Sequence, residues 1–126
     1  MSAEESIIWG RFLSKYGSNF SRFDYDLRVG QGIIPAASVP EIYRDDYIKL
    51  TQKRIDAVGY SGKVATIFEI KVRANLGAIG QLIGYRDLFL NTFPLYSVDS
   101  LHLVCSTIDP DELSVFSKTS ILIDVV

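Results

Sequence analysis

Cysteine and histidine are almost absent from this sequence, which contains one residue of each. A single thiol cannot form an intramolecular disulfide, and it cannot build a cysteine-ligated metal cluster. Cys105 lies in the apolar segment 101–105, so we interpret it as a buried core thiol. His102 lies in the same segment, where a lone histidine is more often structural than catalytic. The sequence therefore excludes a fold held together by internal disulfides.

Long hydrophobic runs and an excess of positive charge are also missing. No segment approaches the ~20 apolar residues needed to cross a bilayer. Glu4 and Glu5 precede the first apolar stretch, which is the wrong charge for a secretory signal, so we expect a cytoplasmic protein without a membrane partner. The net charge of −2 and the pI of about 5.3 argue against non-specific coating of nucleic acid. They do not exclude a nuclease, because acidic metal ligands lower the total charge.

The remaining composition is that of a globular protein. Hydrophobic residues make up 48% and charged residues 22% of the chain, which is the usual balance for a soluble fold. A length of 126 residues is enough for one domain with a real core and too short for two. We therefore expect a single domain over residues 1–126.

Hydrophobic periodicity predicts helices alternating with strands. Residues 3–16 carry apolar residues at helical spacing and end at Gly17, whereas residues 22–29 alternate as a strand with one polar face. Residues 30–40 hold two glycines and two prolines and are predicted to form a loop. The other predicted elements are a short helix over 41–52, strands over 53–60 and 63–72, a helix over 77–90, a strand over 101–105, a helix over 110–117 and a strand over 120–125. This order predicts an α/β fold with a mixed β-sheet flanked by helices.

A predicted hairpin brings acidic residues together. Ser61-Gly62 lies between two β-rich runs and is typical of a two-residue turn. With that turn, Asp56 and Glu69 are diagonal neighbours on one face of the sheet, and Lys71 follows one step further along the same face. A register slip of one residue would move Asp56 to the opposite face.

Two carboxylates and an amine on one face match the needs of phosphodiester hydrolysis. Two carboxylates can share a divalent cation, which lowers the pKa of a bound water and polarises the phosphoryl oxygen. A lysine beside them can orient the water or stabilise the transition state. An exposed cross-strand charge pattern is the commoner explanation for a bare Glu-x-Lys. Here the flanking residues are too apolar for a freely exposed sheet: Ile55, Ala57, Val58, Ile67, Phe68, Ile70 and Val72.

The helix that follows carries a matching polar pair. Gln81 and Tyr85 are spaced i, i+4 and share one helical face, although satisfied polar groups in the core are an alternative explanation. Gly77, Gly80 and Gly84 lower the stability of this helix. Their presence favours a helix whose backbone comes close to another surface.

These motifs follow a fixed order along the chain: Asp56, Glu69-Ile70-Lys71 across the hairpin, and Gln81-x-x-x-Tyr85 in the next helix. That order resembles the PD-(D/E)XK nuclease superfamily, most closely its RecB-like and Cas4-like members and the small archaeal Holliday-junction resolvases. The resemblance covers approximately residues 53–89 and implies a restriction-endonuclease-like fold, with an αβββαβ core followed by a C-terminal helix and strand. Ile55 replaces the proline of the pattern, and the cysteines of Cas4-like iron–sulfur clusters are missing.

The resemblance also implies a role for each motif residue. Asp56 and Glu69 would bind Mg²⁺ or Mn²⁺ with help from the backbone carbonyl of Ile70. Lys71 would position the attacking water. Gln81 would orient the lysine or the water, and Tyr85 would support the site or contact the nucleic-acid backbone.

Further residues are candidates around this centre. Many relatives add a glutamate from the first helix, and Glu5 is the better candidate because it shares the face of the apolar stripe; a first-turn glutamate favoured by the helix dipole is the alternative. Asp24 and Asp26 could lie near the site, although exposed charges are the simpler interpretation. Four basic residues are expected to contact nucleic acid, with a solvated face as the alternative: Lys53, Arg54, Arg73 and Arg86.

The sequence therefore predicts a metal-dependent nuclease that hydrolyses DNA phosphodiester bonds with Mg²⁺ or Mn²⁺. The alternative is a catalytically inactive nuclease-like domain that binds nucleic acid or a protein partner, which the acidic pI favours. Because 126 residues offer a small surface for gripping a duplex, a homodimer or a larger nucleoprotein complex is also expected.

Overall fold

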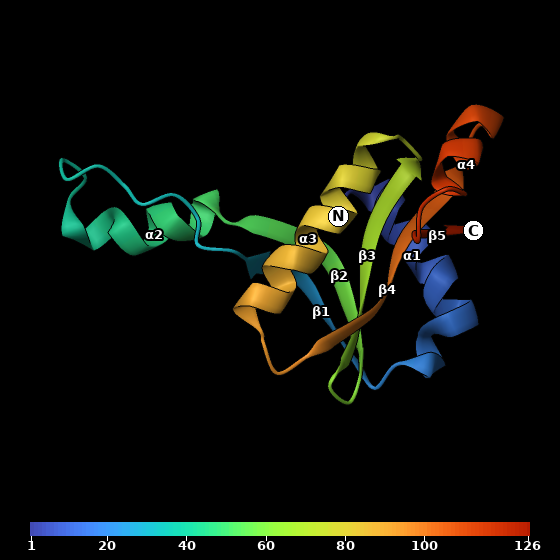
Figure 1. Cartoon of the computed structure of the whole chain (residues 1–126), viewed down its shortest axis with the longest axis horizontal. Helices are drawn as coiled ribbons and strands as arrows, with labels where there is room; N and C mark the ends of the chain where they lie inside the picture. Colours follow the sequence, from blue (N-terminus) through green and yellow to red (C-terminus); the bar gives the residue numbers. More distant parts are fainter.

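The protein, described from Met1 to Val126 by a computed structural model, is built on one five-stranded mixed sheet. In chain order its elements are α1 (Ala3–Tyr16), the 3₁₀ turn η1 (Gly17–Asn19), β1 (Arg22–Val29), α2 (Glu41–Thr51), β2 (Lys53–Ser61), β3 (Val64–Arg73), α3 (Gly77–Thr92), β4 (Ser97–Thr107), α4 (Pro110–Phe116) and β5 (Leu122–Val125). The strands stand side by side in sequence order, antiparallel from β1 to β3 and parallel from β3 to β5. Helices α1 and α3 lie on opposite sides of the sheet (Figure 1). The predicted fold class is confirmed.

Helix α1 begins with a capping box. The side chain of Ser2 accepts a hydrogen bond from the backbone of Glu5, and the Glu5 carboxylate accepts one from the backbone of Ser2. Ile8, Trp9 and Phe12 then bury the apolar stripe of the helix against one face of the sheet. This packing fixes α1 across the strands that carry the candidate site.

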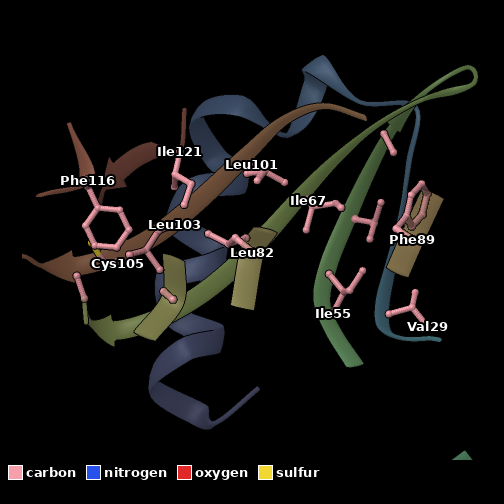
Figure 2. Packing of buried hydrophobic residues seen from close by; sticks show 14 of the residues in the cluster. Val29, Ile55, Ile67, Leu82, Phe89, Leu101, Leu103, Cys105, Phe116 and Ile121 are labelled. Atoms are coloured by element: carbon pink, nitrogen blue, oxygen red, sulfur yellow. The ribbon is translucent and has the colours of Figure 1, made fainter. Parts of the chain in front are cut away.

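The larger hydrophobic core lies on the other face, beneath α3. Leu82 and Phe89 of this helix are fully buried against Ile55 and Ile67 of the central strands, as Figure 2 shows. Alternate residues of β3 thus contribute to different cores, because successive side chains of a strand point to opposite faces. Helix α3 is held firmly over the strands that carry Asp56 and Glu69.

The turn between β2 and β3 lies one residue later than the sequence predicted. Ser61 pairs with Val64, so the turn residues are Gly62 and Lys63 rather than Ser61 and Gly62. Gly62 has a φ of +60°, and a glycine at the first central position is the requirement of a type II′ turn. The register therefore differs by two residues from the predicted one. A shift of two residues keeps Asp56 on the face predicted for it, together with Glu69 and Lys71.

Strand β1 changes face at its midpoint, so the prediction of a single polar face is wrong. Phe23 and Tyr25 contact Trp9 on the α1 side, whereas Leu27 and Val29 belong to the core beneath α3. The change occurs next to Asp26, whose φ of +49° is left-handed. Aspartate tolerates this conformation better than most residues.

Residues 30–52 form an arm that projects from the sheet and carries α2 at its outer part (Figure 1). No residue of α2 is buried, and Ile42 and Leu50 are 80% and 78% exposed. Gly32 lies near the start of the arm and has a φ of +69°. A Cβ at this position would clash with the carbonyl oxygen of Ile48. None of the helices has the length and apolarity needed to span a bilayer.

The C-terminal part of the sheet differs in length from the prediction. Strand β4 extends beyond residues 101–105 at both ends, and β5 is shorter than residues 120–125. His102 joins these strands, because its Nδ1 lies 2.7 Å from Oδ2 of Asp124 and its Nε2 lies 2.9 Å from Oγ of Ser100. His102, the only histidine, therefore links β4 to β5, as expected for a structural residue.

Candidate active site

The candidate site lies where the β2–β3 ladder ends. The last backbone pair of that ladder joins Ala57 to Phe68, and the next residues along the two strands are Asp56 and Glu69. Instead of a further ladder bond, Oδ2 of Asp56 accepts a hydrogen bond of 3.0 Å from the backbone N–H of Ile70. The carboxylate of β2 is thereby fixed against the segment of β3 that carries the other motif residues.

Glu69 is the most deeply buried charged residue of the chain, with 3% of its surface exposed. Its Oε1 lies 3.4 Å from Nζ of Lys71, which is partly exposed. Its Oε2 is buried without any hydrogen-bond partner, and no other buried side-chain oxygen or nitrogen in the protein shares that condition. Buried polar atoms are usually paired, so the Glu69 carboxyl either shares a proton with Asp56, to which it hydrogen-bonds when protonated, or offers this oxygen to a ligand.

Burial dominates the electrostatics of Glu69. Loss of solvent raises the pKa of Glu69 to about 8, and the nearby charge of Asp56 adds to the increase. The ammonium of Lys71 acts in the opposite direction and does not cancel the increase. Two carboxylates close together at a buried position are unfavourable unless a positive charge joins them, which is the condition that a divalent cation satisfies.

Helix α3 brings the polar pair Gln81 and Tyr85 to the same place. Burial raises the pKa of Tyr85 to about 12, and the charges of Glu69 and Asp56 add to the increase, so the phenol lies close to both acids. The side chain of Gln81 has the opposite effect on this pKa. The structure thus gathers the five predicted catalytic residues, which come from β2, β3 and α3.

A cavity of about 430 Å³ opens beside this centre. Gln81 and Tyr85 form part of its lining, so the cavity is continuous with the polar face of α3. Lys53, at the start of β2, provides the only charged side chain of the lining. Lys53, a predicted nucleic-acid contact, therefore lines the same cavity as Gln81 and Tyr85.

Glu5 is not brought to this centre. Its Oε1 accepts a hydrogen bond of 2.8 Å from the backbone N–H of Ser2, within the capping box of α1. Helix α1 covers the face of the sheet opposite α3. No three acidic, histidine or cysteine side chains of the chain converge on one point, so Asp56 and Glu69 form a two-carboxylate centre.

No protein-family model matches this sequence, and no curated protein matches it. Two solved structures are similar. A repair endonuclease from Pyrococcus abyssi has a TM-score of 0.56 and 15% identity, and the alignment covers 100% of this chain and 48% of that one. A structure described as an EndoMS–dsDNA2 complex has a TM-score of 0.54 and 13% identity, covering 100% of this chain and 46% of that one. The chain therefore shares its fold with part of each of these structures. It spans about half the length of either neighbour.

The other predicted basic residues are spread over several surfaces. Arg73 lies at the far end of β3, where its charge helps to lower the pKa of Asp109 at the start of α4. Arg86 follows Tyr85 on α3 and is half-buried. Arg54 is exposed on β2 and pairs directly with Arg28 of β1.

Arg28 of β1 is a basic residue whose position beside Arg54 the sequence alone does not reveal. Two arginines opposite each other in an antiparallel pair repel, and neither forms an ion pair with an acidic group. The period-two pattern of residues 22–29 and 53–60 contained the necessary signal, but only the register between these strands reveals the pair. An anion such as a phosphate group would relieve the repulsion.

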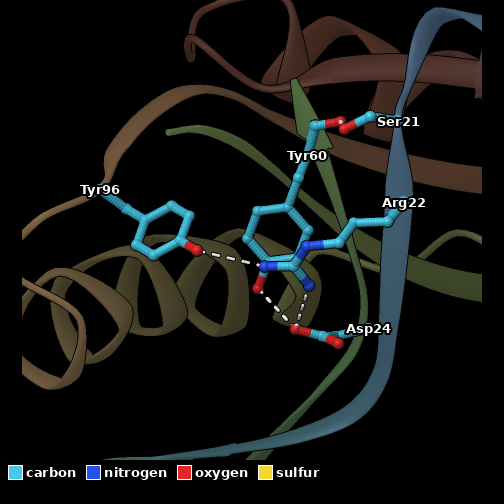
Figure 3. Close-up of polar contacts among 5 residues, drawn as sticks. All are labelled: Ser21, Arg22, Asp24, Tyr60 and Tyr96. Carbon is cyan, nitrogen blue, oxygen red and sulfur yellow. Dashed lines mark hydrogen bonds and ion pairs between the residues drawn. The ribbon is translucent and has the colours of Figure 1, made fainter. Parts of the chain in front are cut away.

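Asp24 belongs to a different cluster, at the other end of β1 (Figure 3). Its Oδ2 accepts hydrogen bonds from the hydroxyl of Tyr60 at 2.8 Å and from the guanidinium of Arg22 at 3.2 Å. The guanidinium also stacks on the Tyr60 ring, 3.8 Å from its centroid, and donates to the hydroxyl of Tyr96. The Asp24 carboxylate is therefore hydrogen-bonded to Arg22 and Tyr60 and does not face the acidic centre.

Proposed function

We propose that this protein is a PD-(D/E)XK-type nuclease that hydrolyses DNA phosphodiester bonds with the help of Mg²⁺ or Mn²⁺. The convergence of Asp56, Glu69 and Lys71 at the end of the β2–β3 ladder is the observation that carries the proposal. The fold shared with a repair endonuclease supports it.

The residues present fit a hard divalent cation. The carboxylates of Asp56 and Glu69 offer oxygen ligands, and the unpartnered Oε2 of Glu69 is a buried acceptor that the protein itself leaves free. The backbone carbonyl of Ile70 is the proposed third protein ligand. When bound, the cation would lower the pKa of a water and polarise the phosphate.

The other side chains would orient the reactants. Lys71 is partly exposed and carries its ammonium beside Glu69, so it can donate a hydrogen bond to the attacking water or to a phosphate oxygen. Gln81 and Tyr85 approach from α3 and line the adjoining cavity. In this position they would hold the lysine, the water or the DNA backbone in place.

A cleavage assay tests this function. Labelled single-stranded, duplex and branched DNA would be incubated with the protein in Mg²⁺, in Mn²⁺ and in a chelator. We expect cleavage that requires the cation and falls by at least 100-fold in Glu69→Gln, as loss of a transition-state contact predicts. Asp24→Asn is the matched control, because it removes an acidic charge outside the site. Unchanged cleavage by Glu69→Gln would contradict the proposal.

A nuclease-like domain that binds without cutting is the alternative. The absence of a third acidic side chain from the centre favours it, because fewer carboxylates hold a cation less tightly. DNA binding by the wild-type protein without cleavage in either metal would select this function.

Assembly as a homodimer or within a nucleoprotein complex stays a prediction. The exposed apolar side chains of the arm, such as Ile42 and Leu50, are the surface most suited to a contact between chains. A mass measurement in solution, repeated with Leu50→Asp, tests whether the chain is a dimer.

A further inference from the structure

One side of α2, which we call its outer face, is apolar and uncovered. Four large side chains of this face are exposed, by 80%, 59%, 39% and 78% respectively: Ile42, Tyr43, Tyr47 and Leu50. Their spacing places them on one side of the helix, and no other helix or strand packs extensively against α2. A contiguous apolar patch on a soluble protein marks an interaction surface.

The opposite face of α2 already has its contacts. The guanidinium of Arg44 donates hydrogen bonds to the carbonyl oxygens of Pro35 and Ala36, at 3.3 and 3.2 Å. The hydroxyl of Thr51 accepts one of 2.7 Å from the backbone N–H of Ile33. These bonds hold the helix on the preceding loop and fix which side is turned outward. A helix of 11 residues is marginal in water without packing, so covering the outer face would stabilise α2.

The charge of α2 argues against nucleic acid as the cover. The helix carries three acidic and two basic residues, and one of the basic residues is Arg44, which is turned toward the loop. The spacing of Asp46 from Tyr43 and Leu50 places its carboxylate within the outer face. A DNA backbone or an anionic lipid surface would be repelled there. The cover is therefore a protein surface that offers a hydrogen-bond donor to Asp46.

The outer face is complementary to itself when it is reversed. Two copies of α2 can lie antiparallel about a two-fold axis that passes between Asp46 and Tyr47, and each contact then occurs twice. Asp46 lies opposite the partner's Tyr47, whose phenol can donate a hydrogen bond to it. Tyr43 lies opposite the partner's Leu50, so an aromatic ring packs on an aliphatic side chain. The outer face itself thus supplies the donor that Asp46 needs.

The rim and the area of this contact are also suitable. Asp45 and Lys49 lie on one flank of the outer face, and neither forms an ion pair within the chain. In the antiparallel arrangement Lys49 lies beside the partner's Asp45, so the rim charges are complementary. The exposed apolar area of the outer face, taken over both chains, is on the order of 1,000 Å², the lower limit for a specific interface.

We propose that the outer face of α2 binds the same face of a second copy of this chain, and that this antiparallel pair of helices makes the protein a homodimer. The inference gives an interface to the homodimer expected from the chain length. It does not depend on the nuclease chemistry. The arm that carries α2 projects from the sheet (Figure 1), and the dimer would contain two acidic centres related by the two-fold axis.

Sedimentation equilibrium of matched leucine variants tests the interface. Leu50→Asp places a charge at the centre of each half of the contact, and we expect it to raise the dissociation constant of the dimer by at least 100-fold. Leu95→Asp is the control, because Leu95 is 81% exposed and lies between α3 and β4, away from the arm. It should leave the dissociation constant unchanged. Both leucines are exposed, so neither variant should lower the melting temperature of the sheet and its cores.

Disulfide formation tests the orientation of the two helices. Cys105, the only native cysteine, is buried, so introduced cysteines report on the surface alone. Oxidation of a mixture of Tyr43→Cys and Leu50→Cys should give a covalent dimer of the two variants. Either variant alone should not, because seven residues separate like positions by about 10 Å along the helices.

Three results would overturn the inference. These are a wild-type protein that is monomeric at high micromolar concentration, a dimer that Leu50→Asp does not weaken, and disulfides that form in each cysteine variant alone but not in the mixture. The nuclease proposal is tested separately. A dimer through α2 that cuts no DNA would leave the interface standing without the nuclease, whereas cleavage by a protein that is always monomeric would leave the nuclease without the interface.

Discussion

The Asp56 carboxylate accepts a hydrogen bond of 3.0 Å from the backbone N–H of Ile70, at the point where β2 and β3 stop pairing. This hydrogen bond joins Asp56 of β2 to Ile70 of β3, the residue that follows Glu69. It satisfies a backbone donor that would otherwise lack a partner, and it sets the spacing of the two carboxylates. Structure and proposed chemistry therefore depend on the same side chain.

The first prediction separates these two roles of Asp56. Asp56→Ala leaves the Ile70 N–H without an acceptor and should lower the free energy of unfolding by about 1–3 kcal/mol. Asp56→Asn keeps an acceptor and should lose much less, while both variants lose cleavage. Urea unfolding at pH 6, where Glu69 is mostly protonated, makes the comparison. Equal stability of the two variants would show that the bond contributes little.

The second prediction concerns pH. The pKa of Glu69 is about 8 in the folded metal-free protein, well above its ordinary value, so the folded state binds a proton that the unfolded state releases. This stability is fully present below about pH 4 and is lost as the pH rises to about 8. We expect a loss on the order of a few kcal/mol over that range, measured by thermal or urea unfolding in a chelator.

Glu69→Gln is the control for this pH dependence. The amide cannot ionise, so the stability of this variant should fall much less between pH 4 and pH 8. At pH 8 the variant should be more stable than the wild-type protein, although we expect it to be inactive. Removal of a catalytic residue often stabilises a protein in this way. If Glu69→Gln shows the same pH dependence of stability as the wild-type protein, groups other than Glu69 cause it.

The order of helices and strands could be predicted because most of these segments have a clear period and a clear end. Ser2 with Glu5 and Asp109 with Glu112 are capping pairs that mark helix starts in the sequence itself. The prediction that Asp56 and Glu69 share a face was correct although the predicted turn was wrong. The error in register was two residues, and side chains alternate with a period of two.

Other features depend on contacts between distant segments. The left-handed Asp26 moves the apolar residues of β1 from one core to the other, and no local pattern signals this conformation. The pairing of His102 with Asp124 requires β5 to lie parallel to β4. The glycines of α3 were recognisable as costly, but the open space around Gly80 and Gly84 is visible only in the fold.

The third prediction concerns the arginine pair. Arg28 and Arg54 stand opposite each other without an acidic partner, so either Arg28→Gln or Arg54→Gln should relieve repulsion and raise stability slightly, by about 0.2–1 kcal/mol. If the pair binds a DNA phosphate, each variant should also weaken DNA binding and lower its salt dependence. Lys118→Gln, which removes a charge after α4, is the control. Equal effects of all three variants on DNA binding would mean that only net charge matters.

The fourth prediction decides the role of Glu5. Glutamine can replace glutamate in a capping box, so Glu5→Gln should keep α1 intact and change stability by less than about 0.5 kcal/mol. Because Glu5 lies in the cap, cleavage should stay within twofold of the wild-type rate. A large loss of cleavage with unchanged stability would restore Glu5 as a metal ligand.

The central claim is that Asp56 and Glu69 share one divalent cation. Titration of the protein with Mn²⁺, followed by the electron paramagnetic resonance signal of the free ion, measures this directly. We predict one saturable site in the wild-type protein, greatly weakened in Glu69→Gln and unaffected in Asp24→Asn. The same Mn²⁺ affinity in Glu69→Gln, or no saturable site in the wild-type protein, would contradict the account.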